Sequence, residues 1–330
     1  MHVHTLGWIG LAAIVLTLIT IDFVGHTRKS HAPSLKEAAI WSGFYIFLAA
    51  SFGVMVWAIY GSHYAAQYYA GWLTEWSLSV DNLFVFIIIL GAFRVPREYQ
   101  QKALLFGIAT ALILRLIFIL LGAALIEHFS WVFYFFGAFL LWTAYSQAKE
   151  SGGSEEDDEY EENQFTRIIR KVLPTTDGFV GDKLFHRVNH RTYVTPLFIA
   201  IIALGSADIM FAFDSIPAIF GLTQEPYLVF AANAFALLGL RQLFFLIDGL
   251  LERLIYLNYG LAIILGFIGL KLINHALHHN EIPFINGGHP ITAIPEPSTM
   301  LSLGVIVVTL VLTAVTSLLA TRGQDQVTKA

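Results

Sequence analysis

Nine long apolar segments recur along this chain of 330 residues. Each approaches the roughly 20 residues that a helix needs to cross a hydrocarbon core of about 30 Å. The fifth segment is short and the sixth contains Pro217, so seven or eight true crossings are an open alternative. We expect an all-α polytopic membrane protein with about nine transmembrane helices, at 6–25, 38–60, 71–92, 103–126, 131–148, 195–221, 228–250, 255–274 and 301–320.

The composition supports this class and excludes others. Hydrophobic residues make up 56% of the chain, charged residues 13%, and the mean hydropathy is +0.66, outside the range of soluble globular proteins. Cysteine is absent, which excludes disulfides, thiolate metal ligands and cysteine nucleophiles. Because no cofactor motif stands out either, we expect neither an enzyme nor a prosthetic group, and no nucleic-acid partner.

Lysine and arginine follow an alternating pattern in the loops. They fall in every second connection, at 28–36, 94–102, 167–191, 253 and 322–329, and the other loops have none. Since Lys and Arg accumulate on the cytoplasmic side of membrane proteins, the pattern predicts an outer N-terminus and a cytoplasmic C-terminus in the inner (plasma) membrane. The first segment lacks a basic start, so we read it as a retained anchor.

Two segments carry related acidic motifs. EWSLSVDN at 75–82 and DIMFAFDS at 208–215 each have an acid, five mostly apolar residues, an aspartate and a small polar residue. A segment with a mid-span arginine follows each, ending GIATALILR at Arg115 and NAFALLGLR at Arg241, and then a glycine-containing segment. Because each copy has an odd number of crossings, three, the second copy enters the membrane from the opposite side. We therefore predict two inverted three-helix repeats with a site near the midplane.

The repeats divide the chain into six parts. These are two N-terminal helices (1–70), repeat 1 (71–148), a cytoplasmic acidic and basic loop (149–194), repeat 2 (195–274), an outer histidine-containing loop (275–300), and a C-terminal helix and tail (301–330).

Carboxylates inside a membrane are costly, so they face the bundle interior and pair, titrate or bind cations. The predicted metal ligands are Glu75, Asp81, Asn82, Asp208, Asp214 and Ser215, with Arg115 and Arg241 balancing charge. Four acids and two arginines leave a net charge of −2, which suits one divalent cation or two protons. The alternative is that the arginines only form structural ion pairs with the acids.

The spacing of the acids predicts a helix distortion. Residues six apart on an ideal helix differ by roughly 120° in direction, whereas residues seven apart share a face, as Glu75 and Asn82 do. We therefore expect bends that bring both acids of a pair to the site. Pro217 would free a backbone carbonyl near Ser215, and the first copy, which has no proline, should bend less.

The types of ligand atom limit which ions the site could bind. Carboxylate, amide and hydroxyl oxygens form a hard set that suits Mg²⁺, Ca²⁺ or Mn²⁺. The residues leave the choice among these three open. Outside the motifs, Asp22 and Asp248 are equally consistent with a role in a vestibule and with solvation at the membrane interface. Lys271 can extend its ammonium group to the interface, and Asn233 should hydrogen-bond within the bundle.

Two loops have their own candidate roles. The acidic run at 151–163 should be a solvated spacer, or alternatively a weak cytosolic cation sensor. The loop 275–300 holds His275, His278, His279, Glu281 and His289. It should be a solvated loop, since the spacing fits no standard set of metal ligands, although such a cluster can collect metal ions.

The motifs EWSLSVDNLFVF and FAFDSIPAIFGLT, with NAFALLGLR and YGLAIILGFIGLK, resemble the TerC/Alx family of integral membrane proteins. The resemblance runs from near residue 20 to near residue 303. It implies links to tellurium resistance and manganese export, and favours Mn²⁺ as the ion. The chain departs from the family at TAYSQAK, where relatives have a lysine near the end of the fifth segment, and in its dense acidic run.

We therefore expect an exporter of a hard divalent cation, Mn²⁺ by the resemblance, with alternating access and proton exchange. Its partners would be the lipid bilayer, the cation, protons and cytosolic stress proteins. The alternative is a membrane scaffold that recruits such proteins through the loop 149–194. An enzyme acting on tellurium oxyanions is disfavoured, because cysteine is absent and a net-negative site repels oxyanions.

Overall fold

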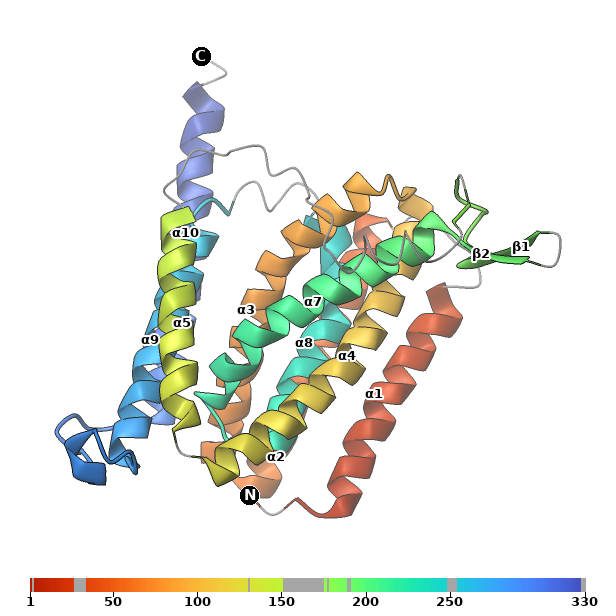
Figure 1. The fold of residues 1–330 in the computed structure, drawn as a ribbon. Helices are drawn as coiled ribbons and strands as arrows, with labels where there is room; N and C mark the ends of the chain where they lie inside the picture. Colours follow the sequence, from red (N-terminus) through yellow and green to blue (C-terminus); the bar gives the residue numbers. More distant parts are fainter. Residues whose placement is uncertain are drawn as a thin grey trace.

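The computed structural model describes residues 1, 3–26, 34–129, 131–150, 175–176, 178–188, 191–247 and 254–327, and the side chains of 25–26, 81, 84, 150, 188, 191, 247 and 322–327 lie outside that description. Nine α-helices fill these ranges, as the apolar segments predict (Figure 1). They are α1 (Thr5–His26), α2 (Leu35–Tyr60), α3 (Ser62–Ala92), α4 (Arg97–His128), α5 (Val132–Glu150), α7 (Pro196–Phe220), α8 (Pro226–Ile247), α9 (Leu257–His278) and α10 (Thr299–Val327).

The helices have the length and composition of membrane spans. Of the nine in the described ranges, eight are long and apolar enough to cross a bilayer. The exception is α5, whose 19 residues end in the polar sequence TAYSQAKE. This is the segment that the sequence marks as short. The chain is an all-α, multi-pass integral membrane protein.

Local sequence signals set several helix ends. Ser34 caps α2 by accepting a hydrogen bond from the backbone N–H of Glu37 at 3.2 Å. Gly61 separates α2 from α3 with φ of 93°, a left-handed conformation that glycine adopts without strain. Thr195 caps α7, and Pro196 occupies its first turn, where a missing N–H costs nothing. These caps fix where the helices enter the bundle.

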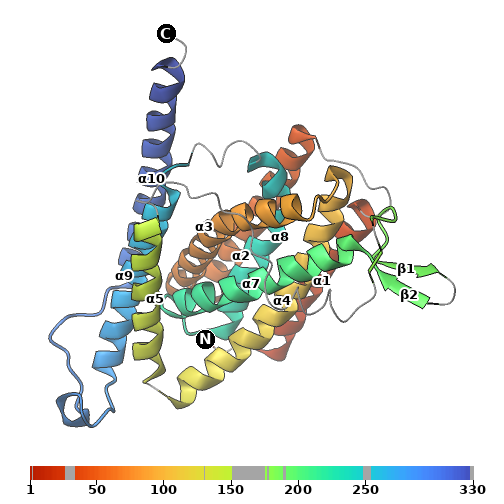
Figure 2. The same cartoon turned by 45° about the horizontal axis from the view of Figure 1, so that its top comes forward.

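The central helix of the bundle is α8, in which 89% of the apolar window is buried. It packs against α2, α3 and α4. In contrast, α1 and α10 lie at the edges with 22% and 11% of their windows buried, and their exposed Leu, Ile and Val side chains suit contact with lipid. Helices α5, α9 and α10 form a group on one side of the bundle (Figures 1 and 2).

Helix contacts pair the two predicted repeats in a regular way. The α3–α8 contact is matched by α4–α7, and α3 also packs on α7, α4 on α8 and α5 on α9. Exchanging α3, α4 and α5 for α7, α8 and α9 therefore turns the α3–α8 contact into the α4–α7 contact and leaves the other three contacts unchanged. Helix α3 ends, and α7 begins, at the end of the bundle that carries the strands, so the two helices run in opposite directions (Figure 1).

Two glycines allow α5 and α9 to cross closely. A Cβ atom added at Gly137 would lie 2.9 Å from the carbonyl oxygen of Gly269, and one added at Gly269 would lie 3.0 Å from that of Gly137. Both distances are too short for a side chain. The glycine-containing segments of the two copies thus meet at their glycines.

The loop 149–194 contains a small β-hairpin that the sequence analysis missed. Strands β1 (Phe185–Val188) and β2 (Arg191–Val194) pair in antiparallel register, with Phe185 opposite Val194. Lys102 at the start of α4 ties this region to the bundle through Asp182, at 2.9 Å to the carboxylate. The acidic run 151–163, which the scaffold alternative invokes, lies outside the described residues.

Neither helix that carries an acid pair is interrupted at its motif. Both α3 and α7 are continuous α-helices, α3 through its EWSLSVDN motif and α7 through DIMFAFDS and Pro217. Continuity alone does not test for a bend, and α3 curves along its length (Figure 1), so the bends at the acid pairs stay a prediction. Within one continuous helix, two acids six residues apart point in different directions.

Candidate functional site

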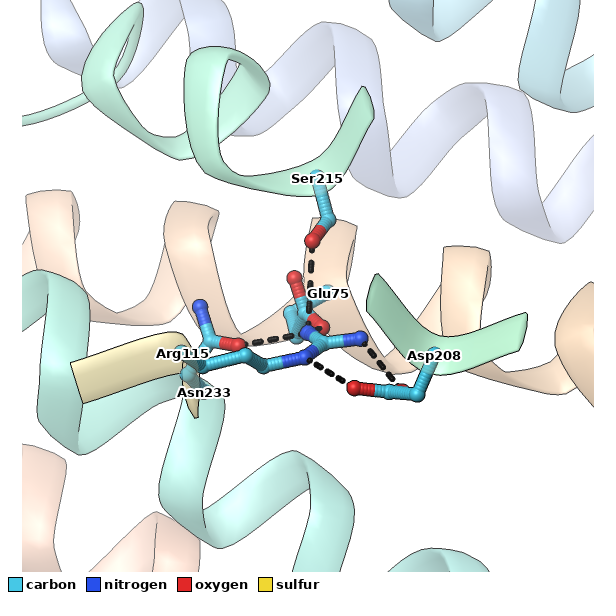
Figure 3. A network of polar contacts seen from close by, with 5 residues as sticks. All are labelled: Glu75, Arg115, Asp208, Ser215 and Asn233. Atoms are coloured by element: carbon cyan, nitrogen blue, oxygen red, sulfur yellow. Dashed lines mark hydrogen bonds and ion pairs between the residues drawn. The ribbon is translucent and has the colours of Figure 1, made fainter. Parts of the chain in front are cut away.

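Arg115 is the centre of a buried polar network (Figure 3). Its Nε and Nη2 atoms donate to the two carboxylate oxygens of Asp208 at 3.0 and 2.9 Å. Its Nη1 atom donates to Asn233 Oδ1 at 2.6 Å and to Ser215 Oγ at 3.2 Å, and it also contacts Glu75 Oε1. One guanidinium thus holds two carboxylates, an amide and a hydroxyl.

Four helices supply this network. Glu75 comes from α3, Arg115 from α4, and Asn233 from α8. Asp208 and Ser215 both come from α7, where their spacing of seven places them on one face, as the helix geometry predicts. The site therefore lies where both predicted repeats meet.

The network is desolvated. Glu75 has no exposed surface, Arg115 is 1% exposed and Asp208 3%. Two carboxylates face one guanidinium, which gives a formal charge of −1 if all three are ionised. Within the described part of the chain, Glu75 Oε2 has no hydrogen-bond partner. A buried carboxylate oxygen without a partner is costly, so this atom is suited to a proton or a cation.

Helix α3 adds a stripe of oxygen atoms that sequence reasoning missed in part. Glu75, Ser79 and Asn82 are spaced by four and three residues, so they share one face, and all three are buried. Ser79 Oγ has no hydrogen-bond partner among the described residues, and neither has Thr74 Oγ1. The signal was present in SLSVDN, where polar residues recur at helical spacing.

Two predicted ligands lie apart from the network or outside the description. Asp214 on α7 accepts a hydrogen bond from Thr143 Oγ1 of α5 at 3.1 Å, away from the face that carries Asp208. Asp81 lies in α3, but its side chain is outside the described residues. In this conformation the six predicted ligands therefore do not form one cluster.

Arg241 has a different partner from the one predicted. Its Nη2 atom pairs with Asp22 Oδ1 of α1 at 2.7 Å, and both side chains are buried. The charge count set Arg241 against the four acids of the motifs. It was wrong because Arg241 is paired with a fifth acid, Asp22. Asp22 is a buried ion-pair partner rather than an interfacial group, and Asp248 lies outside the described residues.

The comparison with protein families decides the membership of the chain. The model described as "Integral membrane protein TerC family" matches residues 60–325. The chain belongs to the TerC family. The resemblance of the acid motifs is thus confirmed, and the match covers α3 to α10 and both motifs of this TerC protein.

Curated relatives of this TerC protein are similar along most of their length. An uncharacterized membrane protein of Mycobacterium tuberculosis (strain H37Rv) is 51% identical over 97% of this chain and 80% of the relative. One from Myxococcus xanthus is 41% identical over 80% and 82%. The Escherichia coli (strain K12) protein Alx, whose name proposes a membrane-bound redox modulator, is 37% identical over 83% and 88%. No solved structure matches the chain.

Proposed function

We propose that this TerC protein transports a hard divalent cation across the membrane and that Glu75 and Asp208 carry the ion. The observation that supports this most is a pair of buried carboxylates, on two helices that run in opposite directions, which both pair with the guanidinium of Arg115. Ionisable groups inside membrane bundles mark ion pathways in many transporters. The oxygen-only neighbourhood, with Asn82, Ser79 and Ser215 nearby, favours Mg²⁺, Ca²⁺ or Mn²⁺. The family resemblance favours Mn²⁺.

Arg115 is the counter-ion of the ion-free state in this proposal. Its guanidinium occupies the position between Glu75 and Asp208 that a divalent cation would take. Two carboxylates, one guanidinium and one proton are neutral together, and exchange of that proton for a divalent cation leaves one positive charge, that of the displaced guanidinium. Ion entry would therefore move Arg115 aside and release a proton, which couples cation transport to proton exchange.

The packing of the helices supports alternating access. The exchange of α3–α5 with α7–α9 that preserves the helix contacts supports two inverted repeats, at 71–148 and 195–274. In transporters of this design the two repeats move against each other around a site near the midplane. The proposed site lies between α3 and α4 of one repeat and α7 and α8 of the other.

The direction of transport is part of the proposal. The alternation of Lys and Arg supports a plasma-membrane protein with an outer N-terminus and a cytoplasmic C-terminus. The proposed activity is export, with the lipid bilayer, the divalent cation and protons as partners. It needs no catalytic residue and no prosthetic group.

A reconstitution experiment tests the proposal. The purified chain is placed in liposomes that contain a Mn²⁺-sensitive dye, or a pH-sensitive dye in a parallel sample. We expect Mn²⁺ influx faster than in protein-free liposomes, accompanied by proton movement in the opposite direction. Parallel runs with Mg²⁺ and Ca²⁺ identify the preferred ion. Flux of none of the three ions would contradict the transport proposal.

A further inference from the structure

A second group of polar side chains lies at the end of the bundle where α9 ends. His275 lies in the last turn of α9, His279 follows directly after α9, and Glu296 precedes α10. One ligand atom from each of the three lies within 4.8 Å of the others. His275 Nδ1 is 2.9 Å from Glu296 Oε1, and His278 Nδ1 is 4.0 Å from the same oxygen. None of these residues belongs to the network around Arg115.

The chain fold brings these three residues together. His279 follows the end of α9, four residues after His275, and the centroids of the two rings are 4.4 Å apart. The returning segment is fixed beside α9 by two hydrogen bonds, from Ile291 N to Leu277 O at 2.9 Å and from Asn274 Nδ2 to Pro295 O at 3.2 Å. Glu296 therefore reaches the histidines from a tethered backbone.

A hydrogen bond to the backbone leaves one ring nitrogen of His279 able to bind a metal ion. Its Nδ1 atom lies 3.1 Å from the carbonyl oxygen of His275. A carbonyl oxygen only accepts, so Nδ1 carries the proton and Nε2 keeps its lone pair. A histidine that donates its second ring N–H to a backbone carbonyl is the arrangement commonly found behind metal-bound imidazoles. His278 makes the same bond to Asn274 O at 2.9 Å.

Two of the three residues line an accessible cavity. His275 and Glu296 are on the wall of a cavity of about 690 Å³, which the start of α3, the α7–α8 turn, α9 and the start of α10 enclose. Gln224 contacts His275 Nε2 at 2.9 Å. Lys271 also lines the cavity, but its ammonium group donates to Ser302 Oγ of α10 at 3.1 Å. An ion in the cavity can thus reach His275 and Glu296, and the ring of His279 lies beside that of His275.

We propose that His275, His279 and Glu296 bind a first-row divalent transition-metal ion at this cavity. Two imidazole nitrogens and one carboxylate oxygen are a donor set that suits Zn²⁺, Fe²⁺, Co²⁺ or Ni²⁺ and leaves positions open for water. This donor set differs from the oxygen-only surroundings of Glu75 and Asp208. The second site therefore does not depend on the transport proposal.

Cobalt absorption tests the site directly, because Co²⁺ bound by nitrogen and oxygen ligands absorbs visible light. The purified protein, with any polyhistidine tag removed, is titrated with Co²⁺ in detergent, and Zn²⁺ is then added as a competitor. We expect saturable Co²⁺ binding that Zn²⁺ displaces. The variants His279→Ala and Glu296→Gln change exposed residues, so the fold should persist.

Two variants and a control test whether these residues bind the metal ion. His279→Ala and Glu296→Gln should each raise the Kd for Co²⁺ by more than about tenfold, the loss that removing even a group behind a metal ligand typically causes. The matched control is His289→Ala, an exposed histidine of the same loop that lies outside the group, and it should bind like the parent. A parent without saturable binding, or an unchanged Kd in both variants, would overturn the proposal.

Discussion

Arg115 donates two parallel hydrogen bonds to the carboxylate of Asp208, from Nε at 3.0 Å and from Nη2 at 2.9 Å. This two-point contact joins α4 to α7 in the middle of the bundle. A planar guanidinium can make it, whereas the ammonium group of lysine cannot reproduce the fork. The contact leaves Nη1 of the same side chain for Glu75, so stability and the proposed transport cycle depend on one residue.

Arg115→Met should destabilise the protein strongly. The change leaves Glu75 and Asp208 buried without a counter-charge, and breaking a buried ion pair from one side costs about 3–5 kcal/mol. Thermal unfolding in detergent measures the loss. Arg115→Met combined with Asp208→Asn should recover part of it, because the uncompensated charge is removed. Unfolding of Arg115→Met at the parent temperature would contradict this role.

Mn²⁺ should stabilise Arg115→Met more than it stabilises the parent. In the parent, the ion competes with the guanidinium for the two carboxylates, and in the variant it does not. A ligand that binds the folded state raises the unfolding temperature, and at a fixed ligand concentration the stabilisation grows with the logarithm of its affinity. The measurement is the shift in unfolding temperature on addition of Mn²⁺ to both proteins. Equal shifts would argue against competition between Arg115 and the ion.

The pair of Asp22 and Arg241 should couple α1 to α8. Its oxygen and nitrogen atoms are 2.7 Å apart and both side chains are buried. A double-mutant cycle with Asp22→Asn and Arg241→Met should give a coupling free energy of about 0.5–3 kcal/mol, the range for residues in contact. Additive single effects would show that the contact contributes nothing to stability.

The crossing of α5 and α9 should not tolerate a side chain at Gly137. Gly137→Ala would place a Cβ atom 2.9 Å from the carbonyl oxygen of Gly269, so we expect a loss of about 1–3 kcal/mol from overpacking. Gly43→Ala in α2 is the matched control, because nothing lies within 4 Å of its added Cβ atom. That variant should be as stable as the parent or up to about 1 kcal/mol more stable, because alanine favours a helix over glycine. Equal losses in both variants would contradict the close crossing.

The helices could be predicted from sequence because each one has its own apolar signal. The nine segments reappear as nine helices in the described ranges, and the doubtful fifth segment is the one that lacks the apolarity of a membrane span. Residues seven apart, such as Asp208 and Ser215, could be placed on one face because helix geometry is local. The hairpin at 185–194 was missed because its strands are short and follow a charged loop.

Which acid meets which arginine could not be predicted. Asp22 and Arg241 are 219 positions apart, and no local pattern indicates that α1 packs beside α8. The charge count treated all the buried charges as one group, whereas the helices divide them between Arg115 and Arg241. Asp214 turned toward Thr143 for the same reason, since the neighbouring helix determines the partner.

The most direct test of the proposed site compares three variants in Mn²⁺-loaded transport assays with matched protein amounts. Glu75→Gln and Asp208→Asn remove the two carboxylates that contact Arg115, and Glu127→Gln changes an exposed acid near the end of α4. Our account predicts flux at the level of protein-free liposomes for the first two variants and parental flux for Glu127→Gln. Parental Mn²⁺ flux in both Glu75→Gln and Asp208→Asn would contradict it.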